Sequence, residues 1–332
     1  MRTLIPLAAG ALLLAVPAGP APAQTSVEIQ EWDVPWPDSR PRDPYVGPDG
    51  AVWFVGQRSD YAAVLDPGTG EFQRFDLPEG AGPHNLIVDD DGTVWYAGNR
   101  AAHIGRLDPG TGAIERIEMP DPGARDPHTL LFADGNRIFF TVQGGNRVGR
   151  LDQATGEVTI REVPTAGARP YGIVEAPDGT IWVAEFGTNK LLRVDPESMD
   201  LEEVPLPRET ARPRRLQPTS DGRIWYVDYA DGMLGAYDPD AGSFEEWALP
   251  RGPESRPYGM AVDARDRLWL VETGPRGAAN RFVGFDPASG EFIAMTEIPS
   301  GGGTVRHMVY HAPTNSVWFG TDANTIGRAR LP

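Results

Sequence analysis

Residues 167–195, GARPYGIVEAPDGTIWVAEFGTNKLLRVD, contain the unit from which the rest of the chain is built. A loop that ends at residues 169–171, Arg-Pro-Tyr, leads into a short apolar segment, a turn at 177–179, and two further segments at 180–185 and 190–195. An Asp-Gly pair between two runs of β-branched and aromatic residues is a strong signal for a β-hairpin. The stretch therefore predicts three consecutive antiparallel strands.

One aromatic side chain marks the second strand of every unit, at intervals of 42 to 49 residues. Repeats of this length that consist of short strands and turns are typical of β-propellers. The anchor residues are Trp53, Trp95, Phe139, Trp182, Trp225, Trp269 and Trp318. Seven anchors predict an all-β fold, a seven-bladed β-propeller of four-stranded blades.

The two ends of the repeat array complement each other. The last unit stops after its third strand, whereas residues 28–35, EIQEWDVP, precede the first unit and match its fourth strand at residues 71–78, EFQRFDLP. We therefore expect the N-terminal strand 28–35 to complete the last blade and close the ring. Residues 24–332 are expected to form a single propeller domain.

The first 23 residues have the pattern of a secretory signal peptide: a basic start, a short apolar run and a small-residue site ending at Ala23. The apolar run is too short and too rich in proline to cross the ~30 Å core of a bilayer as a helix. The chain has no cysteine, so a lipid-anchoring cysteine and disulfides are excluded. The sequence predicts an exported protein, periplasmic or secreted, without a membrane span and with cleavage after Ala23.

The net charge of −17 argues against nucleic-acid binding, which requires a basic surface. We expect a monomer whose ligand is a small molecule or a cyclic peptide held in the central channel.

A second repeated position carries the residues with chemistry. It lies 11 residues before each anchor, follows a proline in six of the seven units, and holds three of the five histidines. Because it opens the innermost strand of each blade, these side chains should form a ring at the mouth of the channel, the usual ligand site of a propeller. Packing against the next blade is the alternative for the tyrosines and the arginines. The ring consists of Arg42, His84, His128, Tyr171, Arg214, Tyr258 and His307.

Acidic residues are expected beside this ring, because the second strand of each blade returns to the face where the first began. They are Glu185, Asp228, Glu272 and Asp322. Carboxylates in this place could hold a metal ion, although for Glu185 and Glu272 hydrogen bonds between blades or arginine pairs are an explanation of at least equal weight.

The repeat resembles the streptogramin lyase (virginiamycin B lyase) family. The resemblance is carried by units such as residues 169–173, RPYGI, with 182–185, WVAE, and by residues 146–150, NRVGR, and it extends over residues 28–332. It implies a magnesium-dependent carbon–oxygen lyase that opens a cyclic depsipeptide by elimination, without water. Mg²⁺ is a hard Lewis acid that prefers oxygen ligands.

By this resemblance, the histidine of the family's last blade falls on His307, which implies a general base because the pKa of imidazole lies near neutral pH. The acidic metal partner falls at or near Asp322, and Glu272 is a second candidate metal ligand. The histidine that the family uses for substrate falls on Tyr258. The family's acidic residue before the last-blade histidine falls on Val305 or Arg306, so the chain departs from the family pattern there and at the tyrosine.

Three functions are therefore considered. The first is a lyase for a cyclic or esterified substrate, with the other six ring residues as substrate contacts: Tyr258, His84, His128, Tyr171, Arg42 and Arg214. The second is a non-catalytic periplasmic propeller that binds a ligand or a protein. The third is a calcium-dependent hydrolase similar to the gluconolactonase propellers. A bound divalent ion, Mg²⁺ or Ca²⁺, would favour the first or third over the second.

Overall fold

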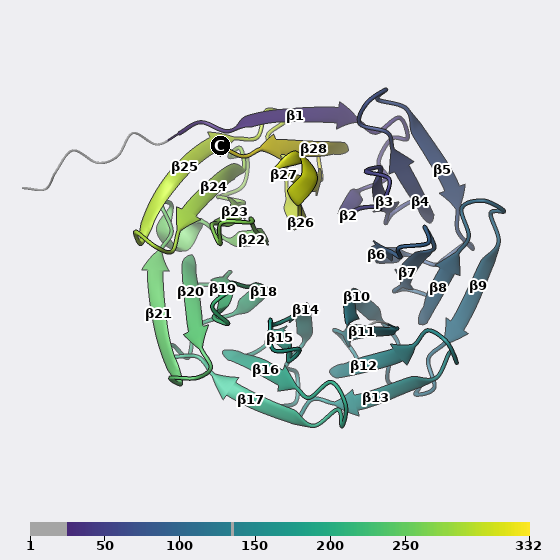
Figure 1. Cartoon of the computed structure of the whole chain (residues 1–332), viewed down its shortest axis with the longest axis horizontal. Helices are drawn as coiled ribbons and strands as arrows, with labels where there is room; N and C mark the ends of the chain where they lie inside the picture. Colours follow the sequence, from purple (N-terminus) through teal and green to yellow (C-terminus); the bar gives the residue numbers. More distant parts are fainter. Residues whose placement is uncertain (1–24, 134–135) are drawn as a thin grey trace, which may run out of the picture.

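The computed structural model describes residues 25–133 and 136–332. They form seven four-stranded antiparallel sheets arranged around one axis (Figure 1), which confirms the predicted seven-bladed β-propeller. Two three-residue 3-10 helices, Gly252–Glu254 and Ala312–Thr314, interrupt the loops. Within the described ranges, no helix has the length and apolar character needed to cross a membrane. The predicted signal peptide 1–23 lies outside the described residues.

Six blades place their strands in chain order from the axis outward, and the last blade takes its outer strand from the N-terminus. The inner strands are β2 (Pro41–Val46), β6 (Pro83–Val88), β10 (Pro127–Ala133), β14 (Pro170–Glu175), β18 (Pro213–Pro218), β22 (Pro257–Val262) and β26 (Val305–His311). The second strands are β3 (Val52–Gly56), β7 (Val94–Gly98), β11 (Arg137–Val142), β15 (Ile181–Glu185), β19 (Ile224–Asp228), β23 (Leu268–Glu272) and β27 (Ser316–Thr321).

The third strands are β4 (Tyr61–Leu65), β8 (His103–Leu107), β12 (Arg147–Asp152), β16 (Lys190–Val194), β20 (Met233–Asp238), β24 (Arg281–Asp286) and β28 (Thr325–Arg330). The outer strands are β5 (Phe72–Asp76), β9 (Ile114–Glu118), β13 (Val158–Glu162), β17 (Leu201–Pro205), β21 (Ser243–Ala248), β25 (Glu291–Glu297) and, for the last blade, β1 (Glu28–Asp33).

The N-terminal strand closes the ring as predicted. β1 pairs antiparallel with β28 along its whole length, from Glu28 opposite Arg330 to Asp33 opposite Thr325 (Figure 1). The pairing continues one residue further through a hydrogen bond from Val34 N to Asn324 O of 3.0 Å. Because the first and last strands share one sheet, the blade forms only when both ends of the propeller are present.

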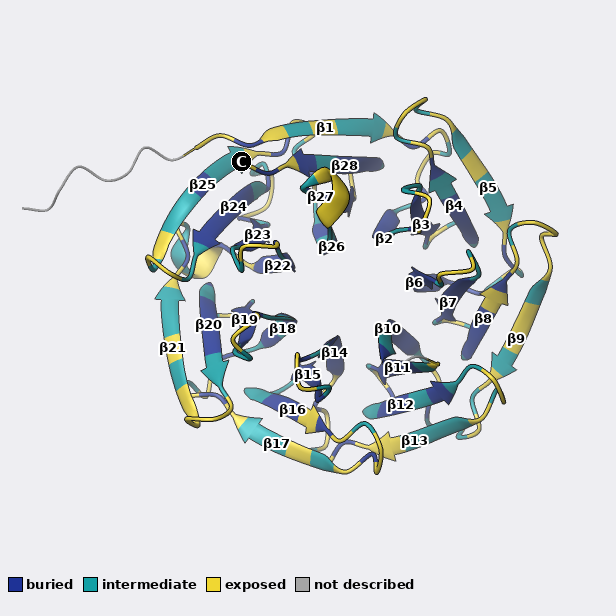
Figure 2. Ribbon diagram, in the orientation of Figure 1, coloured by how far each residue is buried: buried dark blue, intermediate teal, exposed yellow. Residues whose placement is uncertain are grey.

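The hydrophobic core lies between neighbouring blades. The second strands are buried at every position in six blades, whereas the outer strands consist mainly of half-buried and exposed residues (Figure 2). Each anchor aromatic is 7% exposed or less and packs in a cluster shared with the adjacent blade, as Trp53 does with Tyr96. Removing one buried tryptophan side chain typically costs about 3–5 kcal/mol, so the repeated aromatic is the main packing unit of the fold.

Candidate functional site

A β-bulge interrupts the inner strand of every blade at or beside the predicted ring position. The register with the second strand shifts by one residue there, as between Pro127 and Leu130 or between Pro213 and Arg215. A bulge sets two residues against one on the partner strand and re-aims their side chains. The ring residue and the residue after it can therefore both reach the channel axis.

The first of these two layers holds the predicted ring residues in mutual contact. The imidazole centroids of His84 and His128 lie 3.5 Å apart, and His128 lies 4.2 Å from the ring of Tyr171. The hydroxyl of Tyr171 shares a hydrogen bond with that of Tyr258, and the guanidinium carbon of Arg214 lies 3.4 Å from the Tyr258 ring centroid. The structure thus brings these side chains from five blades into one cluster.

The second layer was missed at the sequence level and holds the channel together. Arg42 Nε donates to Asp43 Oδ1 at 3.0 Å, and Arg215 Nη2 crosses from the fifth blade to Asp43 Oδ2 at 3.2 Å. Arg215 also donates to the hydroxyl of Thr129 at 3.4 Å, and Asn85 Nδ2 lies 3.4 Å from Asp43 Oδ2. The sequence held one sign of this layer: a polar residue follows the predicted ring residue directly in four inner strands. These residues are Asp43, Asn85, Thr129 and Arg215.

The cluster has an excess of positive charge. Three guanidinium groups, those of Arg42, Arg214 and Arg215, belong to the two layers, and the carboxylate of Asp43 pairs with two of them, Arg42 and Arg215. Burial by itself raises the pKa of Asp43, but the two arginines that contact it outweigh burial and hold its pKa well below the ordinary value. Asp43 is therefore ionised and offsets only one of the three positive charges.

The histidines of the cluster are neutral because they are buried and lie close to positive charge. Burial, followed by repulsion from Arg42, holds the pKa values of His84 and His128 well below 6.5. His84 Nδ1 lies 3.1 Å from the His128 carbonyl oxygen, so it carries the proton of the neutral ring. Nε2 of His128 is buried and has no hydrogen-bond partner among the described residues.

His307 faces one end of the channel. It lines a cavity of about 440 Å³ to which all seven inner strands contribute through residues that follow the ring. The wall is largely apolar, with residues such as Leu86, Phe132 and Val262, and Asn85 and Gln217 add polar groups. We call this the lower cavity; its size and apolar lining with a few polar groups are those of a small-molecule site.

Arg214 faces the opposite end, which we call the upper mouth. Its guanidinium carbon lies 4.5 Å from the ring centroids of both Phe186 and Tyr229, which follow the ends of β15 and β19. Tyr229 also lines a cavity of about 770 Å³ whose other lining residues include Arg256 and Arg276.

The prediction that His307 belongs to the ring is wrong by one residue. Val305 pairs with Thr321 where the other blades pair a proline, so Arg306 takes the ring position and His307 takes the position of Asn85 and Thr129. Arg214 is half-buried, whereas the other five predicted ring residues, in the first, second, third, fourth and sixth blades, are buried.

The carboxylates expected to join the ring are bound by arginines and by hydrogen-bond donors near them; Asp322 also lies 3.6 Å from Nε of Arg40, in the loop that enters the first blade. Glu272 accepts hydrogen bonds from the backbone of Arg251 and the hydroxyl of Ser255 and forms a salt bridge with Arg281. Asp322 is paired with Arg306 through both oxygens. These two candidate metal ligands therefore offer no free oxygen pair, and no group of three potential ligand side chains occurs among the described residues. As placed, the carboxylates do not fit a magnesium or calcium ion.

The other two carboxylates also have local partners. Thr188 donates to Glu185 at 2.7 Å, and burial raises the pKa of Glu185 to about 7. Arg208 Nη2 donates to Asp228 at 2.6 Å, and the backbone N–H of Arg212 donates to its other oxygen at 2.8 Å. Asp228 therefore stabilises a loop at the upper mouth. In Glu185 only Oε2 is satisfied, because Oε1 is buried and has no hydrogen-bond partner among the described residues.

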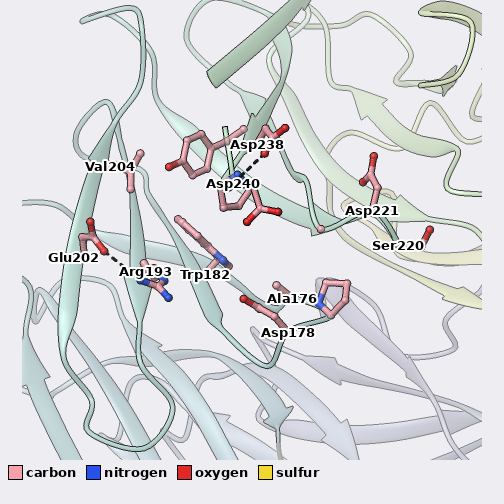
Figure 3. A pocket seen from close by; sticks show the side chains of 14 residues that line it. Ala176, Asp178, Trp182, Arg193, Glu202, Val204, Ser220, Asp221, Asp238 and Asp240 are labelled. Carbon is pink, nitrogen blue, oxygen red and sulfur yellow. Dashed lines mark hydrogen bonds and ion pairs between the residues drawn. The ribbon is translucent and has the colours of Figure 1, made fainter. Parts of the chain in front are cut away.

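A further pocket lies away from the channel, between the fourth and fifth blades (Figure 3). It contains several acidic side chains, but most of them serve local turns. Asp178 accepts from the backbone and hydroxyl of Thr180, and Asp238 accepts from the backbone of Asp240. The acidity of this pocket follows from its turn chemistry, so the channel remains the candidate site.

Comparisons with known proteins agree with the fold. A family model described as the virginiamycin B lyase family matches residues 21–279. A streptogramin B lyase structure is similar with a TM-score of 0.83 and 25% identity, covering 94% of this chain and 100% of that chain. Virginiamycin B lyase from Staphylococcus aureus is similar with a TM-score of 0.83 and 24% identity, covering 92% and 100%. No curated protein matches the chain.

Another similar structure is a catalytically inactive variant of the S. aureus lyase with quinupristin, with a TM-score of 0.83 and 24% identity, covering 92% of this chain and 100% of that chain. A hydrazine synthase from Kuenenia stuttgartiensis shares the fold with a TM-score of 0.74 at 15% identity, covering 90% of this chain and 97% of that chain.

Proposed function

The chain belongs to the virginiamycin B lyase family, and we propose that it is a carbon–oxygen lyase that opens a cyclic ester or depsipeptide by elimination. The observation that carries this proposal is the position of His307. His307 follows the ring position of the last blade, as Asn85 and Thr129 do in theirs, and lines the lower cavity, to which every inner strand contributes. A cyclic peptide can enter a channel end of this kind with its ester next to the imidazole.

In this reaction His307 takes the proton from the carbon adjacent to the ester-bearing carbon. A double bond forms between the two carbons, the carbon–oxygen bond breaks, and its electron pair leaves with the carboxylate. No water is consumed, so substrate and product have the same mass.

The charge state of His307 suits an acceptor that is unprotonated before substrate binds. Burial, followed by repulsion from Arg215, lowers the pKa of His307 to about 3. Nδ1 of the ring has no hydrogen-bond partner among the described residues. An imidazole with so low a pKa is a weak base, and negative charge developing on the substrate beside it would raise its proton affinity in the transition state.

The magnesium dependence implied by family resemblance remains a prediction. Because the oxygens of Glu272 and Asp322 are occupied by arginine and backbone donors, no step of the proposed reaction is assigned to a metal ion. We further propose that the protein is exported after removal of residues 1–23, which mass spectrometry of the mature N-terminus would test.

The experiment is incubation of the mature protein with quinupristin, followed by mass spectrometry. We expect a ring-opened product of unchanged mass, formed at least 10²-fold more slowly by His307→Ala, the usual scale for losing a general base. His311→Ala is the matched control, because His311 lies off the ring and hydrogen-bonds Thr314 at the surface. A parallel sample with EDTA tests the metal. Absence of product, or full turnover by His307→Ala, would overturn the proposal.

A non-catalytic binding propeller is the second candidate. It is favoured by the arginine pairs of both candidate metal carboxylates and by Tyr258 and Arg306 at positions where the family pattern differs. It predicts that calorimetry detects quinupristin binding while mass spectrometry detects no product. The same arginine pairs weigh against the calcium-dependent hydrolase, whose reaction would in addition increase the product mass by one water.

A further inference from the structure

The upper mouth contains buried positive charge without a counter-ion. Asp43 pairs with Arg42 and Arg215, and no carboxylate pairs with Arg214 in the described parts of the chain. A buried charge without a partner is costly in free energy. The excess is notable because the whole chain carries a net charge of −17.

Hydrogen-bond donors of the same arginines are also unpartnered. The side chain of Arg42 is 4% exposed, and its Nη2 has no acceptor among the described residues. Nε of Arg214 is buried and likewise lacks an acceptor there. An unsatisfied buried donor costs about 1–3 kcal/mol, so these groups would gain from an acceptor supplied by a ligand.

Aromatic rings orient Arg214 for such an acceptor. Its guanidinium carbon lies within 5.2 Å of four ring centroids, those of Tyr171, Phe186, Tyr229 and Tyr258. Rings that cover the faces of a guanidinium leave its N–H edge for an acceptor in the plane. Tyr229 connects this arrangement to the cavity of about 770 Å³ beside it.

We propose that the upper mouth binds the oxyanion of a ligand, a carboxylate or phosphate group, on Arg214 and Arg42. The guanidinium edge presents parallel donors that match two oxygens of either group. The remaining part of the ligand would lie in the adjoining cavity against Tyr229. This site is at the opposite end of the channel from His307 and is independent of the proposed lyase.

A ligand at this site would compete with the phenolate form of Tyr171, because the guanidinium group of Arg214, like that of Arg215, lies against the Tyr171 ring. Arg42, Arg214 and Arg215 approach it from two blades, Tyr258 shares its hydroxyl hydrogen bond, and His128, held neutral, packs on its ring. Burial would raise the pKa of Tyr171, but the three arginines together lower it to about 8. A bound oxyanion neutralises the same charge and therefore raises this pKa, and by linkage the phenolate weakens oxyanion binding.

The first measurement is the near-ultraviolet absorption of tyrosinate during a pH titration of the mature protein. We expect an early transition near pH 8 that is absent in Tyr171→Phe and retained in Tyr237→Phe, a residue outside the channel whose burial raises its pKa. Inorganic phosphate should move the transition to higher pH, and sodium chloride at equal ionic strength should not. The proposal is overturned if phosphate leaves the midpoint pH of this transition unchanged, or if sodium chloride shifts the midpoint by the same amount.

The second measurement is calorimetric titration with inorganic phosphate and, separately, with acetate, which distinguishes the two oxyanion classes. Arg214→Met should weaken binding at least tenfold, whereas Arg58→Met, an exposed arginine in a loop at the same face, should bind as the wild type does. Circular dichroism checks that both variants are folded. Binding by Arg214→Met equal to that of the wild type, or no binding of either anion to the wild type, contradicts the site.

Discussion

The two ends of the central channel differ in chemistry although the same seven strands build both. At the upper mouth, the first residues of the inner strands supply three arginines and Asp43, which pairs with two of them. At the lower cavity, later residues of those strands supply an apolar wall around His307. The bridge between Asp43 and Arg215 crosses the axis between the two ends.

The difference shows how one bulge per strand divides a channel into two environments. Before the bulge, side chains are selected for charge and hydrogen bonding; after it, the regular alternation of a strand returns and packing decides the residue. A single propeller can therefore present a cationic surface and an apolar cavity only a few residues apart along each strand.

The largest effect is expected at the bridge between the two ends. Asp43→Asn leaves Arg42 and Arg215 without a counter-ion in a buried position and should lower the free energy of unfolding by about 3–5 kcal/mol. Denaturant unfolding measures this. Asp76→Asn is the control, because Asp76 pairs with Arg74 at the surface and is 76% exposed. A loss at Asp43 no larger than at Asp76 would contradict a buried, charge-balanced bridge.

The affinity of the lower cavity for quinupristin should depend on the volume of the cavity. Val262→Trp places a large ring in the wall of the lower cavity and should weaken quinupristin binding at least tenfold, about 1.4 kcal/mol, as measured by calorimetry. Glu115→Trp adds the same ring to an exposed position on the outer strand β9 and should bind quinupristin as the wild type does. Unchanged affinity of Val262→Trp would show that the ligand does not enter this end of the channel.

Acid should destabilise the fold through its neutral histidines. The folded-state pKa of His307 is lowered to about 3, below the value of about 6.5 for an unfolded histidine, so the unfolded state binds more protons in this window and stability falls as pH falls. His307→Gln should reduce proton uptake on unfolding by at most about one proton, read from stability at several pH values. If His311→Gln reduces proton uptake on unfolding more than His307→Gln does, His311 and not His307 is the histidine that takes up the proton.

The smallest effect is expected at Asp322, in the half-exposed pair with Arg306 at the upper mouth. Asp322→Asn should change the free energy of unfolding by less than about 1 kcal/mol, as is usual for pairs near the surface, with and without magnesium chloride. If magnesium stabilises the wild type and this stabilisation disappears in the variant, Asp322 is a metal ligand in solution.

Six of the seven ring residues were predictable because the position repeats, and the seventh was missed by one residue because the turn of the last blade is longer. A position 11 residues before each anchor aromatic identified His84, His128 and Tyr171 as neighbours, and the structure places them in contact. Asp43 and Arg215 escaped prediction because strict alternation assigns them to the opposite face of the strand. The bulge that turns them to the axis has no signature within a single unit, and only their polarity hinted at it.

For the carboxylates, the sequence predicted the positions but not the interactions. Their position at the ends of the second strands was read from the repeat, but their partners were not. Arg281 for Glu272 and Arg306 for Asp322 lie 9 and 16 residues away in the chain, and nothing in the repeat specifies which side chain reaches an acid first.

The sequence by itself determined the number of blades, the order of the strands and the closure by β1, because periodic burial and turn chemistry are local properties that each unit repeats. Only the tertiary structure decided which charges balance one another and which end of the channel His307 and Arg214 face. Those outcomes depend on side chains from different blades meeting at one axis, where burial makes each charge depend on its neighbours.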